Sequence, residues 1–240
     1  MERMSDIVVI GGTACGPKAA ARARRCDSKA RITLIEQDRN VSVATCGLPY
    51  YVSGVINSER TLLVRGPAYF KETMDVDVMV GTRATAIDRA AHTVDITDVS
   101  TGRASAISYD RLVLATGAVP VIPPIEGTGL AGVFTLTKMR DASGVRDWVS
   151  RTKASKAVIV GAGPIGLEMA EALVTLGLDV TVVEALNWVL PGLLDFEMAA
   201  HVQKRLAGKG AKLVLGRRLA RLEGEGGKVA RALTARSRLY

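Results

Sequence analysis

A cysteine in a helix-opening context is the first residue whose surroundings indicate chemistry. Cys46 lies in the stretch SVATCGLPYY, between Thr45 and a Gly-Leu-Pro run. A cysteine reacts as its thiolate, which a positive helix end stabilises. Proline in the first turn predicts a helix that opens directly after Cys46, so the sulfur would lie at such an end and could exchange with another sulfur. Taken by itself, Cys46 would be interpreted as a buried structural cysteine.

The two other cysteines, Cys15 and Cys26, lie in contexts that do not resemble a nucleophile. An odd number of cysteines at irregular spacing argues against a disulfide framework, so all three are predicted to be free thiols. We expect Cys15 and Cys26 to be small packing residues. With two histidines and no Cys-x-x-Cys pair, no metal site is predicted.

A glycine-rich turn near the start of the chain predicts a dinucleotide site. The apolar run DIVVI (residues 6–10) is typical of a strand, and GGTACG (11–16) follows it before an alanine- and arginine-rich helix and a second strand, RITLIEQ. Glycines let the backbone N–H groups approach a pyrophosphate, whose charge the helix N-terminus stabilises. Glu36, twenty residues after Gly16, lies where an acid would bond a ribose hydroxyl.

A second and cleaner copy of this pattern follows about 150 residues later. The strand KAVIV (156–160) leads into GAGPIG (161–166), which holds every glycine of the template, whereas Thr13 replaces the middle one in the first copy. Glu184 ends the next strand, eighteen residues past Gly166, and no Lys or Arg closely follows it. This arrangement favours a free ribose 2′-hydroxyl and therefore NAD(H) over NADP(H). Two such copies predict that the protein holds two dinucleotides.

The segments between the two copies predict an α/β fold with two Rossmann-like dinucleotide-binding domains. The strand RLVLATG (111–117) is expected to return to the first sheet, and the prolines that follow mark a crossover. Alternating polar and apolar residues over 75–109 predict short antiparallel strands. After the second turn come a helix, a strand and a hairpin, and then the chain ends, so the second domain is expected to be incomplete. The predicted ranges are a first domain over 1–125, a crossover linker over 126–150 and a second domain over 151–240.

Composition narrows the function classes. The net charge of +8 and the pI near 9.6 raise the possibility of a nucleic-acid partner, but the arginines are scattered and no nucleic-acid-binding motif is present. A polyanionic small molecule or an ordinary basic surface is the favoured interpretation. The longest apolar stretch carries acids and glycines, and the start of the chain lacks a signal-peptide pattern. We therefore predict a cytoplasmic protein without a membrane span.

Together, the first glycine turn, the Ala-Thr-Gly strand end before a proline-rich crossover and the GAGPIGLE turn resemble the FAD- and NAD(P)H-dependent pyridine nucleotide-disulfide oxidoreductases. One cysteine in TCGLPYY, with no partner of the Cys-x4-Cys kind, is similar to the branch of coenzyme A-disulfide reductase, persulfide reductase and NADH oxidase. The resemblance makes Cys46 the redox centre and implies that Tyr50 and Tyr51 pack its helix onto the flavin domain. It assigns FAD to Gly11, Gly12, Gly16, Glu36, Thr116 and Gly117, and NADH to Gly161, Gly163, Gly166, Glu168 and Glu184.

The same resemblance implies contacts to coenzyme A. In members that reduce coenzyme A disulfides, arginines on the first helix bind the nucleotide's phosphates, and Arg22 and Arg25 lie on one helix face. Ser42, four residues before Cys46, matches a coenzyme A contact, and Thr45 stands where the branch has asparagine. A solvated helix face is the alternative interpretation of the two arginines.

The expected function is transfer of electrons from NAD(P)H through FAD to Cys46, which would reduce coenzyme A disulfide, persulfide or polysulfide. Two alternatives stay open: an NADH oxidase that uses Cys46 as a sulfenic acid, and a truncated, non-catalytic nucleotide-binding chain. The resemblance covers only about the first half of the family's usual length. It implies that full-length relatives are homodimers, through a domain that we do not expect within these 240 residues.

Overall fold

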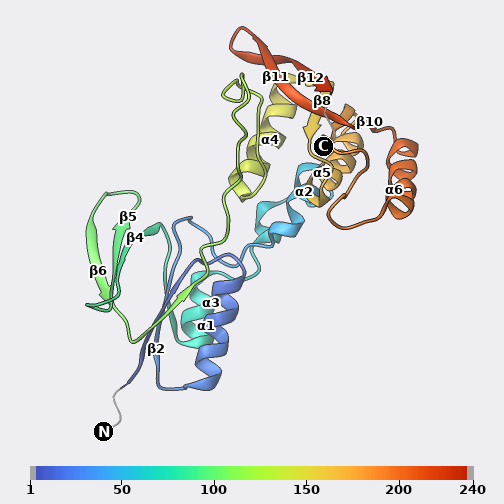
Figure 1. The fold of residues 1–240 in the computed structure, drawn as a ribbon. Coiled ribbons are helices and arrows are strands. Elements are labelled where there is room, and N and C mark those ends of the chain that lie inside the picture. The colour runs from blue at the N-terminus through green and yellow to red at the C-terminus, as the bar shows by residue number, and fades with distance from the viewer. Residues whose placement is uncertain (1–3, 237–240) are drawn as a thin grey trace. The chain divides into compact units, whose positions relative to one another are not determined.

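The computed structural model describes residues 4–236 of the chain, whose backbone forms two compact units (Figure 1). Unit 1 comprises residues 1–45 and 59–119, and unit 2 comprises residues 46–58 and 120–240. Each unit is therefore discontinuous in sequence. The chain passes from one unit to the other after Thr45, after Ser58 and after Val119.

Unit 1 is built on a parallel four-stranded sheet of order β3-β2-β1-β7. The predicted strand 6–10 is confirmed as β1, and the predicted return of residues 111–114 to the first sheet is confirmed because β7 pairs in parallel with β1. The prediction of antiparallel strands over 75–109 holds for three strands, but β3 pairs in parallel with β2. The sheet strands are β1 (Asp6–Ile10), β2 (Arg31–Ile35), β3 (Val76–Met79) and β7 (Arg111–Leu114).

Two layers cover the two faces of this sheet (Figure 1). Because successive side chains of a strand point to opposite faces, Val9 packs toward the helices while Val8 and Ile10 pack toward Val94 and Ile96. All five side chains are buried, so the sheet has a core on each face. The helices are α1 (Cys15–Cys26) and α3 (Pro67–Met74), and the opposite layer is an antiparallel sheet of β4 (Thr82–Asp88), β5 (Thr93–Asp98) and β6 (Ala104–Ser108).

The turn from β5 to β6 is closed by Asp98. Its Oδ1 accepts hydrogen bonds from the Ser100 and Thr101 hydroxyls and backbone N–H groups, at 2.6–3.0 Å. These donors, the Ser100 hydroxyl first, lower the pKa of Asp98 to about 2.

A carboxyl group whose pKa is lower in the folded than in the unfolded chain stabilises the fold above its unfolded pKa, which is about 3.9. We therefore expect the contribution of Asp98 to be complete above about pH 4 and to disappear as the pH falls through about 2. In urea unfolding at pH 2–4, the free energy of unfolding should depend less steeply on pH in Asp98→Asn than in the parent. Asp95→Asn, an exposed acid on the same strand, is the control, and equal slopes in all three proteins would contradict the prediction.

Unit 2 repeats the plan of the first sheet with a parallel sheet of order β10-β9-β8. The predicted strands 156–160 and 179–184, the helix after the second glycine turn, and the final helix, strand and hairpin are all confirmed. The elements are α2 (Leu48–Val52), α4 (Met139–Thr152), β8 (Lys156–Val160), α5 (Pro164–Thr175), β9 (Asp179–Val183), α6 (Phe196–Gly208), β10 (Lys212–Val214), β11 (Arg217–Glu225) and β12 (Lys228–Arg236).

The two parallel sheets differ at one edge. In unit 1, β1 lies between β2 and β7, whereas in unit 2, within residues 4–236, β8 pairs with β9 alone. Val158 and Val160 of β8 are 47% and 54% exposed, while their counterparts Val8 and Ile10 in β1 are buried. The described parallel sheet of unit 2 therefore has three strands, and that of unit 1 has four.

The boundaries of the two units in the sequence differ from the predicted domain boundaries. The unit boundary lies between Val119 and Pro120, where the proline-rich connection begins. The predicted linker range, 126–150, contains most of α4, which buries Ala142 and Val145 in unit 2. Such a helix needs an apolar stripe rather than a long apolar run, which is why composition alone suggested a linker.

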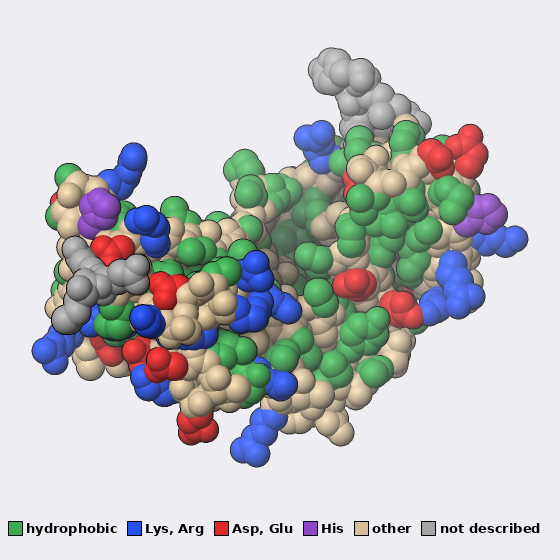
Figure 2. Space-filling model, turned by 90° about the horizontal axis from the view of Figure 1, so that it is seen from below, with side chains coloured by type: hydrophobic (Ala, Val, Ile, Leu, Met, Phe, Trp, Pro, Cys, Tyr) green, Lys and Arg blue, Asp and Glu red, His purple; other side chains and the backbone are tan. Residues whose placement is uncertain are grey.

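Large apolar side chains reach the surface at several places (Figure 2). On the face that Figure 2 shows, Lys and Arg are interspersed with Asp and Glu. No helix among the described residues is long and apolar enough to cross a membrane. The large apolar side chains of unit 2 outside the crossover that are more than half exposed include Tyr50, Val55, Val160, Ile165, Leu193, Phe196 and Met198.

Candidate functional sites

The first glycine turn is packed so tightly that two of its glycines admit no side chain. Gly11 has a φ of 106°, and a Cβ on it would overlap the carbonyl group of Ala115 at the end of β7. A Cβ on Gly16 would overlap the carbonyl oxygen of Gly11. The chain therefore turns sharply from β1 into α1, as a pyrophosphate cradle requires.

Glu36 fastens this turn from the end of β2. Its Oε2 accepts a hydrogen bond of 2.6 Å from the N–H of Gly12, and its Oε1 accepts one of 2.8 Å from the N–H of Asp38. Glu36 is 4% exposed, so these bonds satisfy a buried carboxylate. The predicted ribose-binding acid thus lies at the turn and also holds its backbone.

The second glycine turn repeats this arrangement. Oε2 of Glu184 accepts a hydrogen bond of 2.8 Å from the N–H of Ala162, and Oε1 accepts one of 2.9 Å from Leu186. A Cβ on Gly166 would overlap the carbonyl oxygen of Gly161, whose φ is 101°. The same cradle therefore stands at the end of β8, with its carboxylate at the end of β9.

A third backbone contact is common to both copies and was missed from the sequence. The N–H of Ser42 donates to the carbonyl of Gly12 at 2.7 Å, and the N–H of Leu190 donates to that of Ala162 at 2.9 Å. Ser42 and Leu190 have φ values of 54° and 52°, in the left-handed region that side chains disfavour. Serine and leucine are not residue types that favour a left-handed backbone, so the sequence does not predict this contact. The contact is evident only when the structures of the two units are compared with each other.

Both turns therefore fit a dinucleotide. Each turn leads directly into the N-terminus of a helix, which favours a phosphate, and a carboxylate stands at the end of the second strand. Gly163 has open space around the position of a Cβ. Of the further predicted cofactor residues, Thr116 and Gly117 are exposed just past β7, and Glu168 is exposed on α5.

The segment around Cys46 adopts the predicted helical form. Residues Thr45–Gly47 make a 3₁₀ turn, and α2 begins at Leu48 with Pro49 in its first turn. Cys46 is exposed, so it is not a buried structural cysteine. The structure assigns Cys46 and α2 to unit 2, which holds the second glycine turn.

Two expectations about this part of the sequence are wrong. Cys15 and Cys26 are exposed at the two ends of α1 rather than packed, because the buried stripe of that helix consists of other residues, such as Ala20. Tyr50 is 54% exposed rather than packed, whereas Tyr51 is buried and its ring centre lies 4.8 Å from the guanidinium carbon of Arg146 within unit 2. The three cysteines are free thiols, as predicted. No group of three or more His, Cys, Asp or Glu in residues 4–236 is placed to hold a metal ion.

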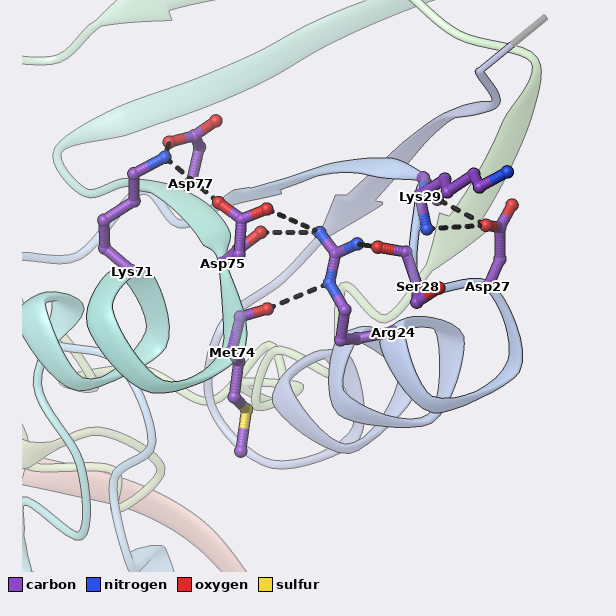
Figure 3. A network of polar contacts seen from close by, with 9 residues as sticks. Arg24, Asp27, Ser28, Lys29, Lys71, Met74, Asp75 and Asp77 are labelled. Carbon is purple, nitrogen blue, oxygen red and sulfur yellow. Dashed lines mark hydrogen bonds and ion pairs between the residues drawn. The ribbon is translucent and has the colours of Figure 1, made fainter. Parts of the chain in front are cut away.

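The arginines of α1 differ in whether they bind other residues of the protein. Arg24 donates to the carbonyl oxygens of Ser28, Met74 and Asp75 at 2.7–3.0 Å and pairs with the Asp75 carboxylate, so it ties α1 to the end of α3 (Figure 3). Arg22 and Arg25, the two predicted coenzyme A contacts, are exposed, and no hydrogen bond or ion pair of theirs is found among the described residues. They remain available to an anion.

The order of these parts, a glycine turn, an exposed cysteine and a second glycine turn, agrees with a known family. Residues 5–239 match the family described as pyridine nucleotide-disulphide oxidoreductase. The chain belongs to this family.

The chain is similar to two curated proteins and to one solved structure that are described here. The NADH oxidase of Methanocaldococcus jannaschii is 35% identical over 218 residues, 91% of this chain and 48% of that protein. The coenzyme A disulfide reductase of Staphylococcus haemolyticus is 36% identical over 185 residues, 75% of this chain and 40% of that one. The solved structure of an NAD-dependent persulfide reductase from A. fulgidus is 45% identical, with a TM-score of 0.91, over 95% of this chain and 42% of that one. The chain spans less than half the length of each.

Proposed function

We propose that this pyridine nucleotide-disulphide oxidoreductase passes electrons from NADH by way of FAD to Cys46, which reduces a coenzyme A disulfide or persulfide. The observation that carries the proposal is the exposed Cys46 in the turn that leads into α2, in a chain with two similar dinucleotide cradles. Relatives at 35–36% identity are named for NADH oxidation and coenzyme A disulfide reduction.

The residues of unit 1 would hold FAD, and those of unit 2 would hold NADH. FAD, when bound, supplies the redox chemistry that links a two-electron donor to a sulfur acceptor. Gly11, Gly12 and Gly16 would let a pyrophosphate approach the backbone at the start of α1, and Glu36 offers an acceptor for a ribose hydroxyl. Thr116 and Gly117 would line the flavin side of this cradle.

NADH is favoured over NADPH because of the carboxylate of Glu184. It lies at the end of β9, and residues 185–190 contain no Lys or Arg. A 2′-phosphate would meet a negative charge there, and no cation directly follows it in the sequence. Gly161, Gly163 and Gly166 would hold the pyrophosphate, and Glu168 on α5 would lie near the nicotinamide.

Cys46 would perform the sulfur chemistry. Its thiolate attacks one sulfur of the disulfide RS–SR, a bond forms between Cys46 Sγ and that sulfur, and RS⁻ leaves. The electron pair that NADH supplies then breaks the mixed disulfide, which restores the thiolate and releases the second RS⁻. Overall, RS–SR, NADH and a proton give two RSH and NAD⁺. Exposure of Cys46 leaves the sulfur accessible to such a substrate.

The test is a comparison of acceptors on the purified, FAD-reconstituted protein. We expect flavin absorbance near stoichiometry, bleaching by NADH without oxygen, and recovery of colour when coenzyme A disulfide or a persulfide is added. If colour returned only with oxygen, the NADH oxidase interpretation, which the Methanocaldococcus relative supports, would replace the proposal. A colourless protein that still binds NADH would identify a non-catalytic nucleotide-binding chain.

Binding of NADH can be followed without flavin. Both tryptophans, Trp148 and Trp188, lie in unit 2, and Trp188 lies four residues after Glu184. Energy transfer from tryptophan to NADH should therefore report the second cradle, and Trp188→Phe should remove a large part of it. Absence of any transfer on NADH addition would argue against a nucleotide in unit 2.

The exposed arginines of α1 give a separate prediction for coenzyme A. Replacing Arg22 and Arg25 together by alanine should raise the KM for coenzyme A disulfide by about tenfold or more, because each charge-assisted bond to a phosphate contributes about 1.5–3 kcal/mol. Arg89→Ala, an exposed arginine in the turn after β4, is the matched control. Ser42 and Thr45 would add polar contacts beside the sulfur. An unchanged KM in the double variant would assign these arginines to a solvated helix face.

A further inference from the structure

The helix that follows Cys46 cannot hold its position by itself. α2 contains five residues, Leu48–Val52, and follows the 3₁₀ turn of Cys46 without a spacer. An isolated helix of this length is unstable in water, because helix nucleation is unfavourable and few hydrogen bonds form afterwards. The place of Cys46 within unit 2 therefore depends on what α2 contacts.

Two longer helices of unit 2, α4 and α5, contact α2 (Figure 1). Leu48 is 2% exposed and Val52 is 0% exposed, so the apolar side of α2 is buried completely. Apolar burial is non-directional and fixes which side of α2 faces inward, but it does not by itself fix the helix along its axis. A directional contact is needed for that.

Arg146 of α4 supplies a directional contact at the C-terminal end of α2. Its guanidinium carbon lies 4.8 Å from the centre of the Tyr51 ring, within the range of a cation–π interaction. Its Nη1 also donates to the Tyr51 carbonyl oxygen at 3.4 Å. That carbonyl is among the last ones of the helix, where a cation is favoured. One side chain thus contacts both the ring and the backbone of Tyr51, which is 8% exposed.

We propose that Arg146 is a positioning residue for Cys46: by holding Tyr51 it fixes α2, and with it the turn that carries the sulfur. The role of Cys46 in sulfur reduction is the proposed function on which this inference rests. Arg146 does not touch Cys46 among the described contacts, so it acts through α2.

The test replaces Arg146 by methionine, which keeps a long apolar stem and removes the charge and the donors. Each cysteine is then labelled with iodoacetamide, and its rate is measured by mass spectrometry of its own peptide. We expect the rate at Cys46 to rise at least about threefold as α2 loosens, with Cys15 and Cys26 unchanged. With FAD bound, the kcat for the disulfide should fall about five- to tenfold, because a displaced nucleophile loses its orientation, while the rate of flavin reduction by NADH stays the same.

Arg151→Met is the matched control, because Arg151 also lies on α4 and over a ring, that of Trp148 at 5.7 Å, but has no contact with Tyr51 among the described residues. Arg146→Lys keeps the cation over the ring and should restore most of the parental labelling rate. Energy transfer from tryptophan to NADH serves as the measure of an intact unit 2 in every variant.

Different results would overturn the positioning role of Arg146 and the proposed role of Cys46 in sulfur reduction. Parental labelling of Cys46 in Arg146→Met, or an equal change in Arg151→Met, would overturn the positioning role even if Cys46 proved essential. Conversely, full activity of Cys46→Ser would overturn the proposed function, while a selective change of Cys46 labelling would still assign Arg146 its positioning role. Loss of NADH energy transfer in Arg146→Met, with no rescue by lysine, would make Arg146 a residue of general stability and also overturn the inference.

Discussion

Cys46→Ser is expected to lower the reduction of coenzyme A disulfide or persulfide at least about a hundredfold while NADH binding and flavin reduction stay at parental levels. The loss of a covalent nucleophile removes the mixed-disulfide route and leaves only slow, uncatalysed exchange. Serine keeps the size and exposure of the side chain, so the fold should not change. The measurement is steady-state turnover with each acceptor beside single-turnover bleaching of the flavin.

Cys26→Ser is the matched control, because Cys26 is also an exposed free thiol. It should keep parental turnover. Retention of most activity in Cys46→Ser would mean that the acceptor does not react with this sulfur, and the protein would then transfer electrons by another route. Loss of activity with oxygen as well as with disulfides would make Cys46 the shared site of both reactions.

Gly16→Ala is expected to have the second large effect, on the turn that we propose to hold FAD. A Cβ at this position would overlap the carbonyl oxygen of Gly11 and approach Val9, so the turn from β1 to α1 must shift. Overpacking of this kind costs about 1–3 kcal/mol of folding free energy. Because the N–H groups of the same turn would hold a pyrophosphate, we also expect the variant to lose most of its bound FAD.

Gly66→Ala provides the comparison, since a Cβ there meets nothing within 4 Å and Gly66 has an extended backbone before α3. Thermal unfolding and flavin absorbance per chain should separate the two variants. A Gly16→Ala protein that kept parental flavin content and unfolding temperature would show that the turn accommodates a side chain, against the geometry described above.

The sequence predicted those parts of the fold that depend on local pattern. The apolar runs 6–10 and 156–160, each followed by a glycine turn and an acid at the end of the next strand, appear as β1 and β8 with Glu36 and Glu184 at the expected places. Each is a short-range signal, because glycines are needed where the backbone turns sharply and an apolar run is typical of a strand with a buried sheet position, as in β1. In β8 the same apolar run forms the strand although Val158 and Val160 are exposed.

Burial of single side chains was harder to predict, because it depends on which elements meet. Cys15 and Cys26 are exposed although cysteine is often buried, and Tyr51 packs with Arg146, a residue 95 positions away in sequence. Likewise, β3 joins the parallel sheet although its alternating pattern suits an antiparallel strand equally well. Such pairings are decided by tertiary contacts that no local window contains.

The left-handed backbones of Ser42 and Leu190 were also beyond local pattern. Both lie near the end of a loop that returns to a glycine turn, and both donate an N–H to it. Serine and leucine are not residue types that favour this conformation, which costs about 1–3 kcal/mol where the surroundings enforce it. The conformation recurs at matching places in both units. We therefore attribute it to the hydrogen bond that each residue donates to the glycine turn rather than to the residue type.

The discontinuous units have a consequence for any attempt to separate them. Because the backbone changes unit after Thr45, after Ser58 and after Val119, a single cleavage at the last of these points would leave α2 and Cys46 on the fragment that carries unit 1. The fragment beginning at Pro120 would then lack the helix that covers part of α4 and α5. Unit 2 can complete its packing only when residues 46–58, which lie more than sixty residues before Pro120, pack against the rest of the unit. Its folding therefore requires contacts between segments far apart in the sequence.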